Sequence, residues 1–181
     1  MPSLGAIYLD SAIRRLLTYK ALGDSTFAQL EAPDFHYTPN EESNSVAVII
    51  RHLHGNMLSR WTNFLTEDGE KPDRNRDSEF LPPPLGKEAV IALWEEGWSC
   101  LLTTLRSLRE EDLLKTITIR NEPLIVIDAI NRQLAHYPHH VGQIVYIGKM
   151  IRNEKWQSLS IPRGQSESAN RQMKELHAKN H

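Results

Sequence analysis

Hydrophobic residues recur at three- and four-residue intervals in four long segments, which cover approximately residues 4–22, 45–66, 87–108 and 124–152. This spacing places the apolar side chains on one face of an α-helix. Stretches rich in proline, glycine and charge separate the segments. Because helices of this kind bury their apolar faces against one another, the pattern predicts an all-α, four-helix bundle that forms a single domain over residues 1–181.

The connections between these helices differ in character. Residues 67–85, between the second and third helices, are dense in charge, glycine and proline, so we expect a long loop that is either a lid or an ordered excursion over a site. The alternating "TITIR" predicts one short extended segment before the fourth helix, with a turn at residues 121 and 122. After Asn153 we expect one hydrophobic anchor, "WQSLSIP", and then a polar, solvated end.

Composition narrows the class of protein. A net charge of -2 gives no excess of Lys and Arg for binding nucleic acid. No stretch approaches the roughly 20 apolar residues of a membrane helix, and the first residues lack a signal-peptide pattern, so we expect a cytoplasmic protein. The single cysteine, Cys100, cannot form an internal disulfide, and its apolar helical surroundings favour an inert core thiol.

The stretch "HYPHHVGQ" places a proline inside the fourth helix. Proline in a helix interior removes a backbone hydrogen bond and costs about 3 kcal/mol. The apolar pattern does not reset at Pro138, so we expect a kinked but continuous helix. The alternative is a helix that stops at Tyr137 and a second helix that begins at Pro138.

Histidines are the candidate functional residues. In a continuous helix, about 100° of rotation per residue places His136 and His140 on one partly buried face and turns His139 toward the polar side. Two imidazoles at this spacing can share a metal ion if a third ligand comes from elsewhere. The second helix offers His52 and His54, and helical geometry does not choose between them. Core or edge histidines without any metal are the alternative.

The same residues carry a resemblance to a known superfamily. "HYPHHVGQIVYIGKM" resembles the C-terminal metal motif of the DinB/YfiT-like superfamily, commonly His-x-x-x-His-Arg-Gly-Gln, with His136 and His140 in register and Val141 in place of the arginine. "SVAVIIRHLHGNMLSRW" resembles that superfamily's second helix, in which a histidine before an aliphatic residue is the first ligand, and His52 fits this position. With "NFLTEDGEKPDRNRDSEF", "INRQLAHY" and "WQSLSIPRG", the likeness covers nearly the whole chain and matches a branch known as a domain of unknown function.

This resemblance implies an up-down-down-up bundle, often homodimeric, in which His52, His136 and His140 hold one divalent metal ion. Zinc and nickel are the expected ions, and iron and manganese also accept imidazole ligands. Relatives in the superfamily include metal-dependent thiol transferases that act with bacillithiol, mycothiol or glutathione, and a maleylpyruvate isomerase. The expected partner is therefore a small-molecule substrate, with a low-molecular-weight thiol as the candidate.

Three neutral histidines leave an open coordination position, as in catalytic zinc sites. An ion of this kind lowers the pKa of a bound water or thiol. Gln143 either orients a bound molecule or packs as an ordinary polar residue. We therefore expect a metal-dependent transferase, or a hydrolase, and the alternative is a non-catalytic, metal-containing dimer of stress-related or binding type.

Several arginines and tryptophans outside the histidine motif are interpreted as structural residues. Arg60 interrupts the apolar side of the second helix, so it should have a carboxylate partner. The "RNR" of residues 74–76 is interpreted as a solvated charge run, with a grip on an anionic cosubstrate as the alternative. Core packing is predicted for Trp61, Trp94 and Trp98.

Overall fold

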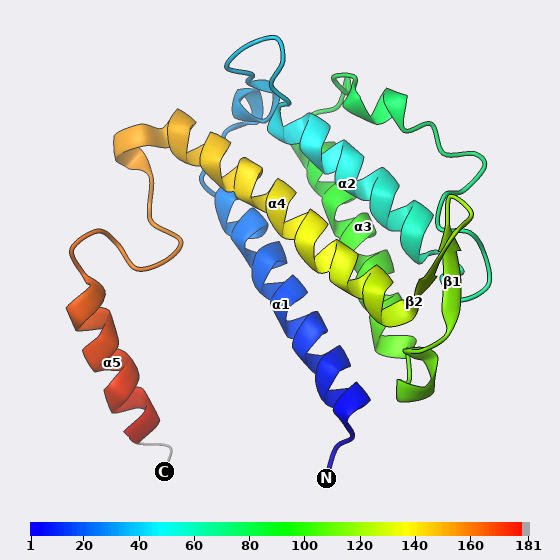
Figure 1. The fold of residues 1–181 in the computed structure, drawn as a ribbon. Helices are drawn as coiled ribbons and strands as arrows, with labels where there is room; N and C mark the ends of the chain where they lie inside the picture. Colours follow the sequence, from blue (N-terminus) through cyan, green and yellow to red (C-terminus); the bar gives the residue numbers. More distant parts are fainter. Residues whose placement is uncertain (179–181) are drawn as a thin grey trace.

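The structure is a computed structural model that describes residues 1–178, and it is predominantly helical (Figure 1). Its five α-helices are α1 (Leu4–Phe27), α2 (Val46–Trp61), α3 (Lys87–Ser107), α4 (Val126–Arg152) and α5 (Ser166–Ala178). Short 3-10 helices are η1 (Ala32–His36), η2 (Asp77–Phe80), η3 (Glu110–Asp112) and η4 (Asn153–Lys155). The predicted helical class is confirmed at this level.

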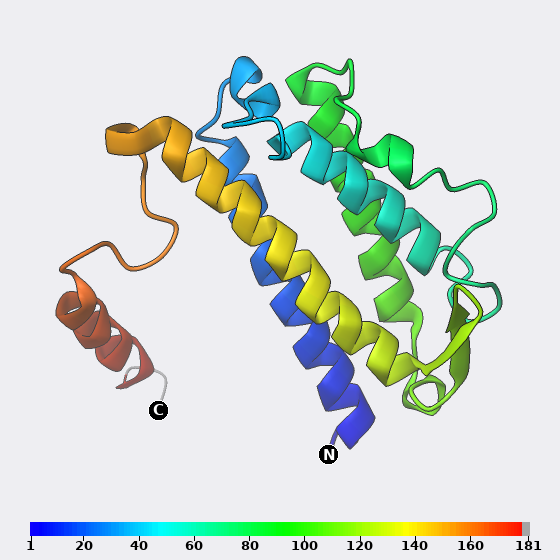
Figure 2. The same cartoon turned by 45° about the horizontal axis from the view of Figure 1, so that its top comes forward.

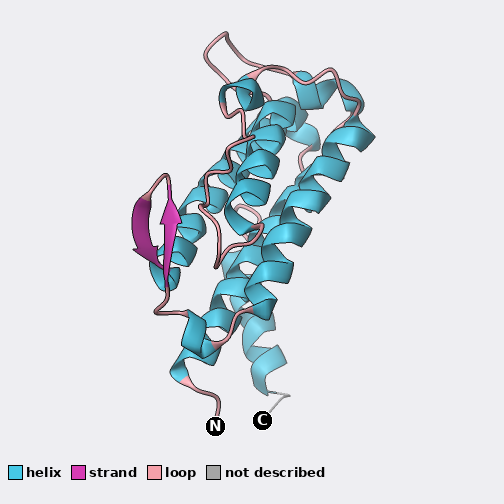
Figure 3. Cartoon of the chain, turned by 90° about the vertical axis from the view of Figure 1, so that its right-hand side faces the viewer, coloured by secondary structure: helices cyan, strands magenta, loops and turns pink. Residues whose placement is uncertain are grey.

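One small antiparallel sheet precedes α4 and lies beside the helices, as Figure 3 shows in magenta. Strand β1 (Thr116–Ile119) pairs with β2 (Glu122–Ile125), with Thr116 opposite Ile125. The turn between them is formed by Arg120 and Asn121, whose φ angles are 57° and 62°. The predicted single extended segment is therefore corrected to a hairpin, the turn lies one residue earlier than expected, and α4 begins at Val126 instead of residue 124.

A shared hydrophobic core joins the four long helices α1 to α4. Helix α2 packs against α3 and α1 packs against α4, and further contacts join α1 to α3 and α2 to α4 (Figures 1 and 2). The predicted core tryptophans are confirmed, since Trp61 and Trp94 are each 1% exposed and Trp98 is 0% exposed. Burying apolar side chains of this size stabilises a fold by about 1.5–3 kcal/mol each. This core fixes the relative positions of α2 and α4.

Helix α1 continues past the predicted end near Gly23 to Phe27. Gly23 is buried inside the helix, and a Cβ atom there would lie 2.4 Å from Cζ2 of Trp94. This glycine therefore allows the Trp94 ring to approach α1, which explains why it does not end the helix. Glycine often follows the end of a helix, and for this reason the prediction ended the helix at a glycine that instead permits close packing.

Two further boundaries bear on the site. Ser45 caps α2, because its side chain accepts a hydrogen bond from the N–H of Val48, as expected for a serine at this position. Helix α2 ends at Trp61 instead of residue 66. Helix α4 runs without a break through Pro138, which confirms the continuous helix and excludes a stop at Tyr137.

The C-terminal segment is largely exposed, as predicted, and it also contains a helix that the sequence pattern did not predict. Residues of α5 form an amphipathic helix that lies apart from α1 to α4 in both Figure 1 and Figure 2, with Met173 and Leu176 exposed. Within the described part of the chain, the helices lack the combination of length and apolar character that crossing a bilayer requires.

Candidate metal site

Helices α2 and α4 bring three histidine rings together. One ligand nitrogen from each of His52, His136 and His140 lies within 4.8 Å of the other two. The Nε2 atom of His136 is 3.4 Å from Nε2 of His52 and 3.1 Å from Nε2 of His140. Because α4 is continuous through Pro138, its two histidines stay one helical turn apart on the same face. The structure thus unites the three predicted residues, while their role as metal ligands stays a prediction.

The opposite nitrogen of each ring has a side-chain partner. Nδ1 of His52 lies 2.9 Å from Oε2 of Glu79. Nδ1 of His136 lies 3.1 Å from Oε1 of Gln133, and Nδ1 of His140 lies 2.9 Å from Oε1 of Gln143. Since all three partners are oxygen acceptors, each Nδ1 carries the proton and donates it. Each Nε2 then presents a lone pair toward the common centre, which is the tautomer that binds metal ions.

This donor set fits a divalent cation. Three Nε2 lone pairs without protons between them repel one another at the observed 3.1 Å and 3.4 Å separations, and a shared cation would turn that repulsion into attraction. Nitrogen ligands at about 2.0–2.1 Å from a tetrahedral ion are about 3.3–3.4 Å apart, close to these distances. Imidazole nitrogens suit zinc, nickel, iron and manganese, so the ligands do not select one ion.

Burial keeps the rings of His136 and His140 in their neutral form. Burial, with the nearby His140 and His52 rings adding to the effect, lowers the pKa of His136 to about 3. Burial also lowers the pKa of His140. Both rings are therefore neutral at pH 7, and a neutral imidazole coordinates a metal ion without first losing a proton.

Glu79 is a site residue that the sequence did not reveal. Its carboxylate is buried, and besides His52 it accepts hydrogen bonds from Nε and Nη2 of Arg74, at 2.7 Å and 2.9 Å. Burial opposes its ionisation, but the hydrogen bonds with His52 and Arg74 outweigh this and lower the pKa of Glu79. Gly55 of α2 makes room for it, because a Cβ atom there would lie 2.4 Å from Oε1 of Glu79.

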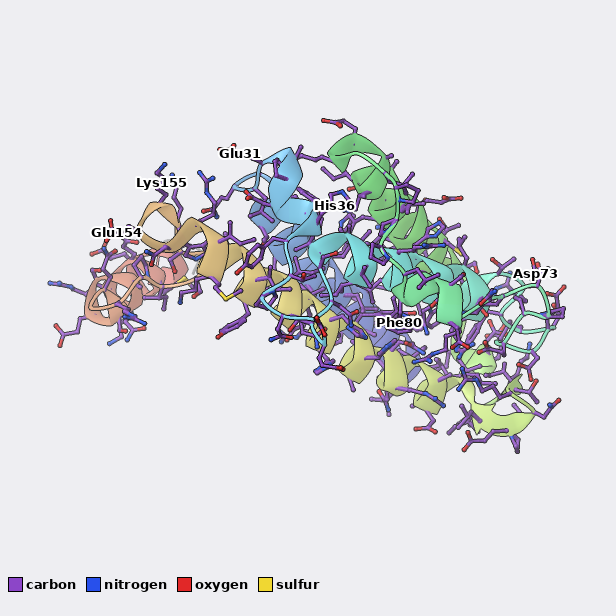
Figure 4. All side chains as sticks on the ribbon, turned by 90° about the horizontal axis from the view of Figure 1, so that it is seen from above. Glu31, His36, Asp73, Phe80, Glu154 and Lys155 are labelled. Carbon is purple, nitrogen blue, oxygen red and sulfur yellow. The ribbon has the colours of Figure 1, made fainter. Side chains whose placement is uncertain are left out.

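The long loop is an ordered excursion over the site, which is one of the two alternatives that the sequence predicted for it. Its η2 turn carries Glu79 and also Phe80, whose ring stacks on His52 with the ring centroids 4.7 Å apart. Figure 4 places Phe80 close to the helices and Asp73 at the outer end of the same loop. The loop therefore covers one side of the His52 ring.

Charged residues of the loop are organised by ion pairs. Arg60 contacts Glu70 at 2.9 Å, which confirms its predicted carboxylate partner, and it also donates to the carbonyl of Gly69. Arg74 has 5% side-chain exposure and pairs with both Glu79 and Glu70. The solvated interpretation of residues 74–76 is therefore wrong for Arg74, because two carboxylates draw it into the protein.

The other candidates lie outside the cluster. His54 points toward α3 and contacts Glu96 at 2.9 Å. His139 is exposed, and its Nε2 lies 3.3 Å from Nε2 of Gln143. Cys100 is half-buried and burial raises the pKa of its thiol, in line with an unreactive packing role.

A cavity of about 420 Å³ opens onto the three rings. Asn56, Phe80 and Gln133 line it together with five arginines. Its size falls within the range of small-molecule sites, about 300–1,000 Å³. A molecule held in the cavity can therefore reach the ring nitrogens.

Fold and site together define a predominantly helical protein with a histidine cluster able to hold a metal ion beside a small-molecule cavity. The chain belongs to the family described as "Protein of unknown function (DUF1572)", whose family model matches residues 3–165. That range includes all three clustered histidines and Glu79. Searches of curated proteins and of solved structures gave no match to this chain.

Proposed function

We propose that this protein is a DinB-like, metal-binding four-helix bundle that acts as a divalent-metal-dependent transferase on a small molecule, with a low-molecular-weight thiol of the bacillithiol type or water as cosubstrate. The convergence of three imidazole Nε2 atoms beside a cavity is the observation that carries this proposal. The proposed ion is zinc or nickel, held by His52, His136 and His140.

Each protein group has a defined task at this site. Glu79, Gln133 and Gln143 fix the tautomer and the orientation of the three rings through Nδ1. Phe80 excludes water from one face of His52. When bound, a divalent cation supplies Lewis-acid chemistry, which lowers the pKa of a thiol or water that reaches it.

Two features favour catalysis over a purely structural ion. Among residues 1–178, the group of clustered metal-binding side chains contains three histidines and no fourth member, whereas structural zinc sites have four protein ligands. The cavity also gives a small molecule access to the cluster. The alternative is a non-catalytic metal protein, supported by the origin of the ligands on both α2 and α4, which an ion would tie together.

Elemental analysis of the purified protein tests the proposal. We expect about one divalent ion per chain in the wild type and almost none in His136→Ala, because two remaining histidines bind weakly. His54→Ala is the matched control and should keep the ion, since its ring faces Glu96. Equal metal content in wild type and His136→Ala would refute a shared ion.

A thermal-shift screen of the metal-loaded protein then separates the two alternatives. Bacillithiol, mycothiol and glutathione are the probes, and a transferase should be stabilised by one of them, because a ligand that binds only the folded state raises its stability. A non-catalytic metal protein should respond to the metal and to none of the thiols.

We also propose a single domain, cytoplasmic location and a homodimeric state, on the basis of the superfamily resemblance. Light scattering coupled to size-exclusion chromatography measures the oligomeric state directly. A monomeric mass would remove the dimer from the proposal and leave the metal site unchanged.

A further inference from the structure

We propose that the cavity beside the histidine cluster selects a small organic anion bearing carboxylate or phosphate groups, gripped by Arg76, Arg120 and Arg132, an assignment that rests on the proposed function and names its substrate class. The three arginines come from the long loop, the β1–β2 turn and α4. All three are exposed at the cavity.

The lining of this cavity has a strong charge asymmetry. Five arginines line it, and the lining contains no aspartate or glutamate among the described residues. Two of the five, Arg60 and Arg74, have 5% side-chain exposure and form part of the ion-pair network below the surface. The other three, Arg76, Arg120 and Arg132, are exposed residues at the cavity, and they are called the rim arginines below.

Nearby carboxylates do not balance these charges. Glu70 is shared among three guanidinium groups, at 2.9 Å from Arg60, 3.3 Å from Arg74 and 3.1 Å from Arg120. The carboxylate of Glu79 is occupied by Arg74 and by His52. Two carboxylates thus serve three arginines and a histidine, so Glu70 and Glu79 do not neutralise Arg76 and Arg132.

The remaining two rim arginines have weak or no acidic partners. Arg132 lies 3.9 Å from Glu122, and both side chains are about half exposed or more, so this pair contributes little. Arg76 forms no ion pair with any residue of the described chain, and its guanidinium lies over the Phe80 ring, 4.9 Å from the centroid. A positive potential in a concave site attracts anions.

The backbone holds Arg120 at the rim. The carboxylate of Asp68 accepts hydrogen bonds from the N–H groups of Arg120 and Asn121, at 2.8 Å and 2.9 Å. Both turn residues have left-handed φ angles, which cost about 1 kcal/mol or more for residues other than glycine. Asp68 therefore fixes a turn whose conformation presents an arginine to the cavity.

The rim arginines line the same cavity as the three histidines. Arg132 precedes His136 by four residues on α4, so the two side chains are neighbours on one helix face. An anion that Arg132 holds therefore lies next to the Nε2 atoms. Guanidinium groups recognise carboxylate and phosphate through paired hydrogen bonds, and the cavity volume of about 420 Å³ suits a small molecule instead of a polymer.

Calorimetric titration with succinate, inorganic phosphate and the neutral succinamide tests this assignment on the full chain. The variants are Arg76→Gln, Arg120→Asn and Arg132→Gln, where asparagine is chosen because it tolerates the left-handed turn. Arg106→Gln, at an exposed position of α3 outside the cavity, is the matched control. We expect one of the two anions to bind, succinamide to bind far more weakly, and each rim variant to lose about tenfold in affinity.

Arg132→Lys provides a check that does not depend on the fold of the glutamine variants. It keeps the charge, so it should recover part of the anion affinity that Arg132→Gln loses. Equal binding of succinate and succinamide, or unchanged anion affinity in all three rim variants, would overturn the assignment. If only phosphate binds, and the three rim variants bind it as tightly as the wild type does, the assignment is likewise overturned.

The metal-stripped protein separates this inference from the proposed function. Because the arginines remain, the stripped protein should keep arginine-dependent anion binding. Anion binding that disappears with the metal and ignores the rim variants would show ligation by the ion alone, which contradicts the arginine grip and leaves the metal proposal intact. Arginine-dependent binding in a wild type that never acquires metal would support the grip and refute the metal proposal.

Discussion

His52 and His54 lie two residues apart on α2, and both contact a glutamate at 2.9 Å, yet their surroundings differ. The His52 side chain is 5% exposed and its partner Glu79 is 7% exposed. The His54 side chain is 18% exposed and its partner Glu96 is 62% exposed. One histidine faces α4 and two more imidazoles, and the other faces the surface of α3.

The decisive difference is which ring nitrogen the glutamate contacts. Glu79 contacts Nδ1 of His52 and leaves Nε2 directed at His136 and His140. Glu96 contacts Nε2 of His54, the outer nitrogen of the ring. A carboxylate can therefore prepare a histidine for metal binding or occupy the nitrogen that would bind, and sequence spacing does not distinguish the two cases.

The largest effect is expected from removing the rings themselves. His52→Ala should abolish copurified metal, because it removes the one ligand that α2 contributes, whereas His54→Ala should keep wild-type metal content. Elemental analysis of both proteins, with circular dichroism to confirm folding, measures this. Loss of metal in both variants, or in neither, would break the comparison.

Changing the two glutamates sharpens the same contrast. Glu79→Gln weakens the charge-assisted contact that orients His52, so the dissociation constant for zinc should rise about 10–100-fold. Glu96→Gln should leave zinc affinity unchanged, since its partner lies outside the cluster. Competition titration with a chromophoric chelator gives both constants, and equal constants for the two variants would count against the role of Glu79.

Acid should destabilise the metal-free protein through His136. Its pKa is about 3 in the folded state against 6.5 for a free histidine, so below pH 6.5 the unfolded chain binds more protons. The free energy of unfolding therefore falls as the pH drops from 6.5 toward 3.

Urea unfolding of the metal-free protein at pH 7 and pH 5 measures this effect. After allowance for partial solvent screening, we expect His136→Asn to reduce the loss of stability between these pH values by about 1 kcal/mol, while His54→Asn keeps the wild-type dependence. An identical pH dependence in wild type and His136→Asn would contradict a neutral, buried ring.

A smaller effect is expected at Gly55. A methyl group there would lie 2.4 Å from Oε1 of Glu79, so Gly55→Ala should displace this carboxylate and weaken zinc binding about three- to tenfold. Gly142→Ala is the control on α4, since a methyl group there would meet nothing within 4 Å, and it should only gain about 0.5–1 kcal/mol of helix stability. Chelator competition and thermal unfolding measure the two effects, and equal zinc affinities would argue against tight packing at Glu79.

Periodicity alone predicted the four long helices, because their apolar faces meet in one core. It also predicted that Pro138 lies inside a continuous helix, which keeps His136 and His140 together. The choice of His52 over His54 needed the superfamily resemblance. Helical geometry gave no preference, because the deciding contact comes from a distant loop.

Other features depended on contacts that no local pattern encodes. Glu79 lies in a charged loop that resembles solvated sequence, and only its pairing with Arg74 and His52 draws it inward. The β2 strand forms because Glu122–Ile125 pairs with β1, although Leu124 and Ile125 were expected to begin the fourth helix. Gly23 was misjudged because its role is to admit the ring of Trp94, which belongs to a different helix and is distant in the sequence.

X-ray absorption at the metal edge of the zinc- or nickel-loaded protein tests the central claim most directly. Three imidazoles sharing one ion should give about three nitrogen scatterers at about 2.0–2.1 Å, with the ring signature of histidine and a remaining light atom from solvent or ligand. His136→Ala should lower the imidazole count or lose the ion. A spectrum dominated by sulfur, or one with oxygen ligands and no imidazole signature, would contradict the account.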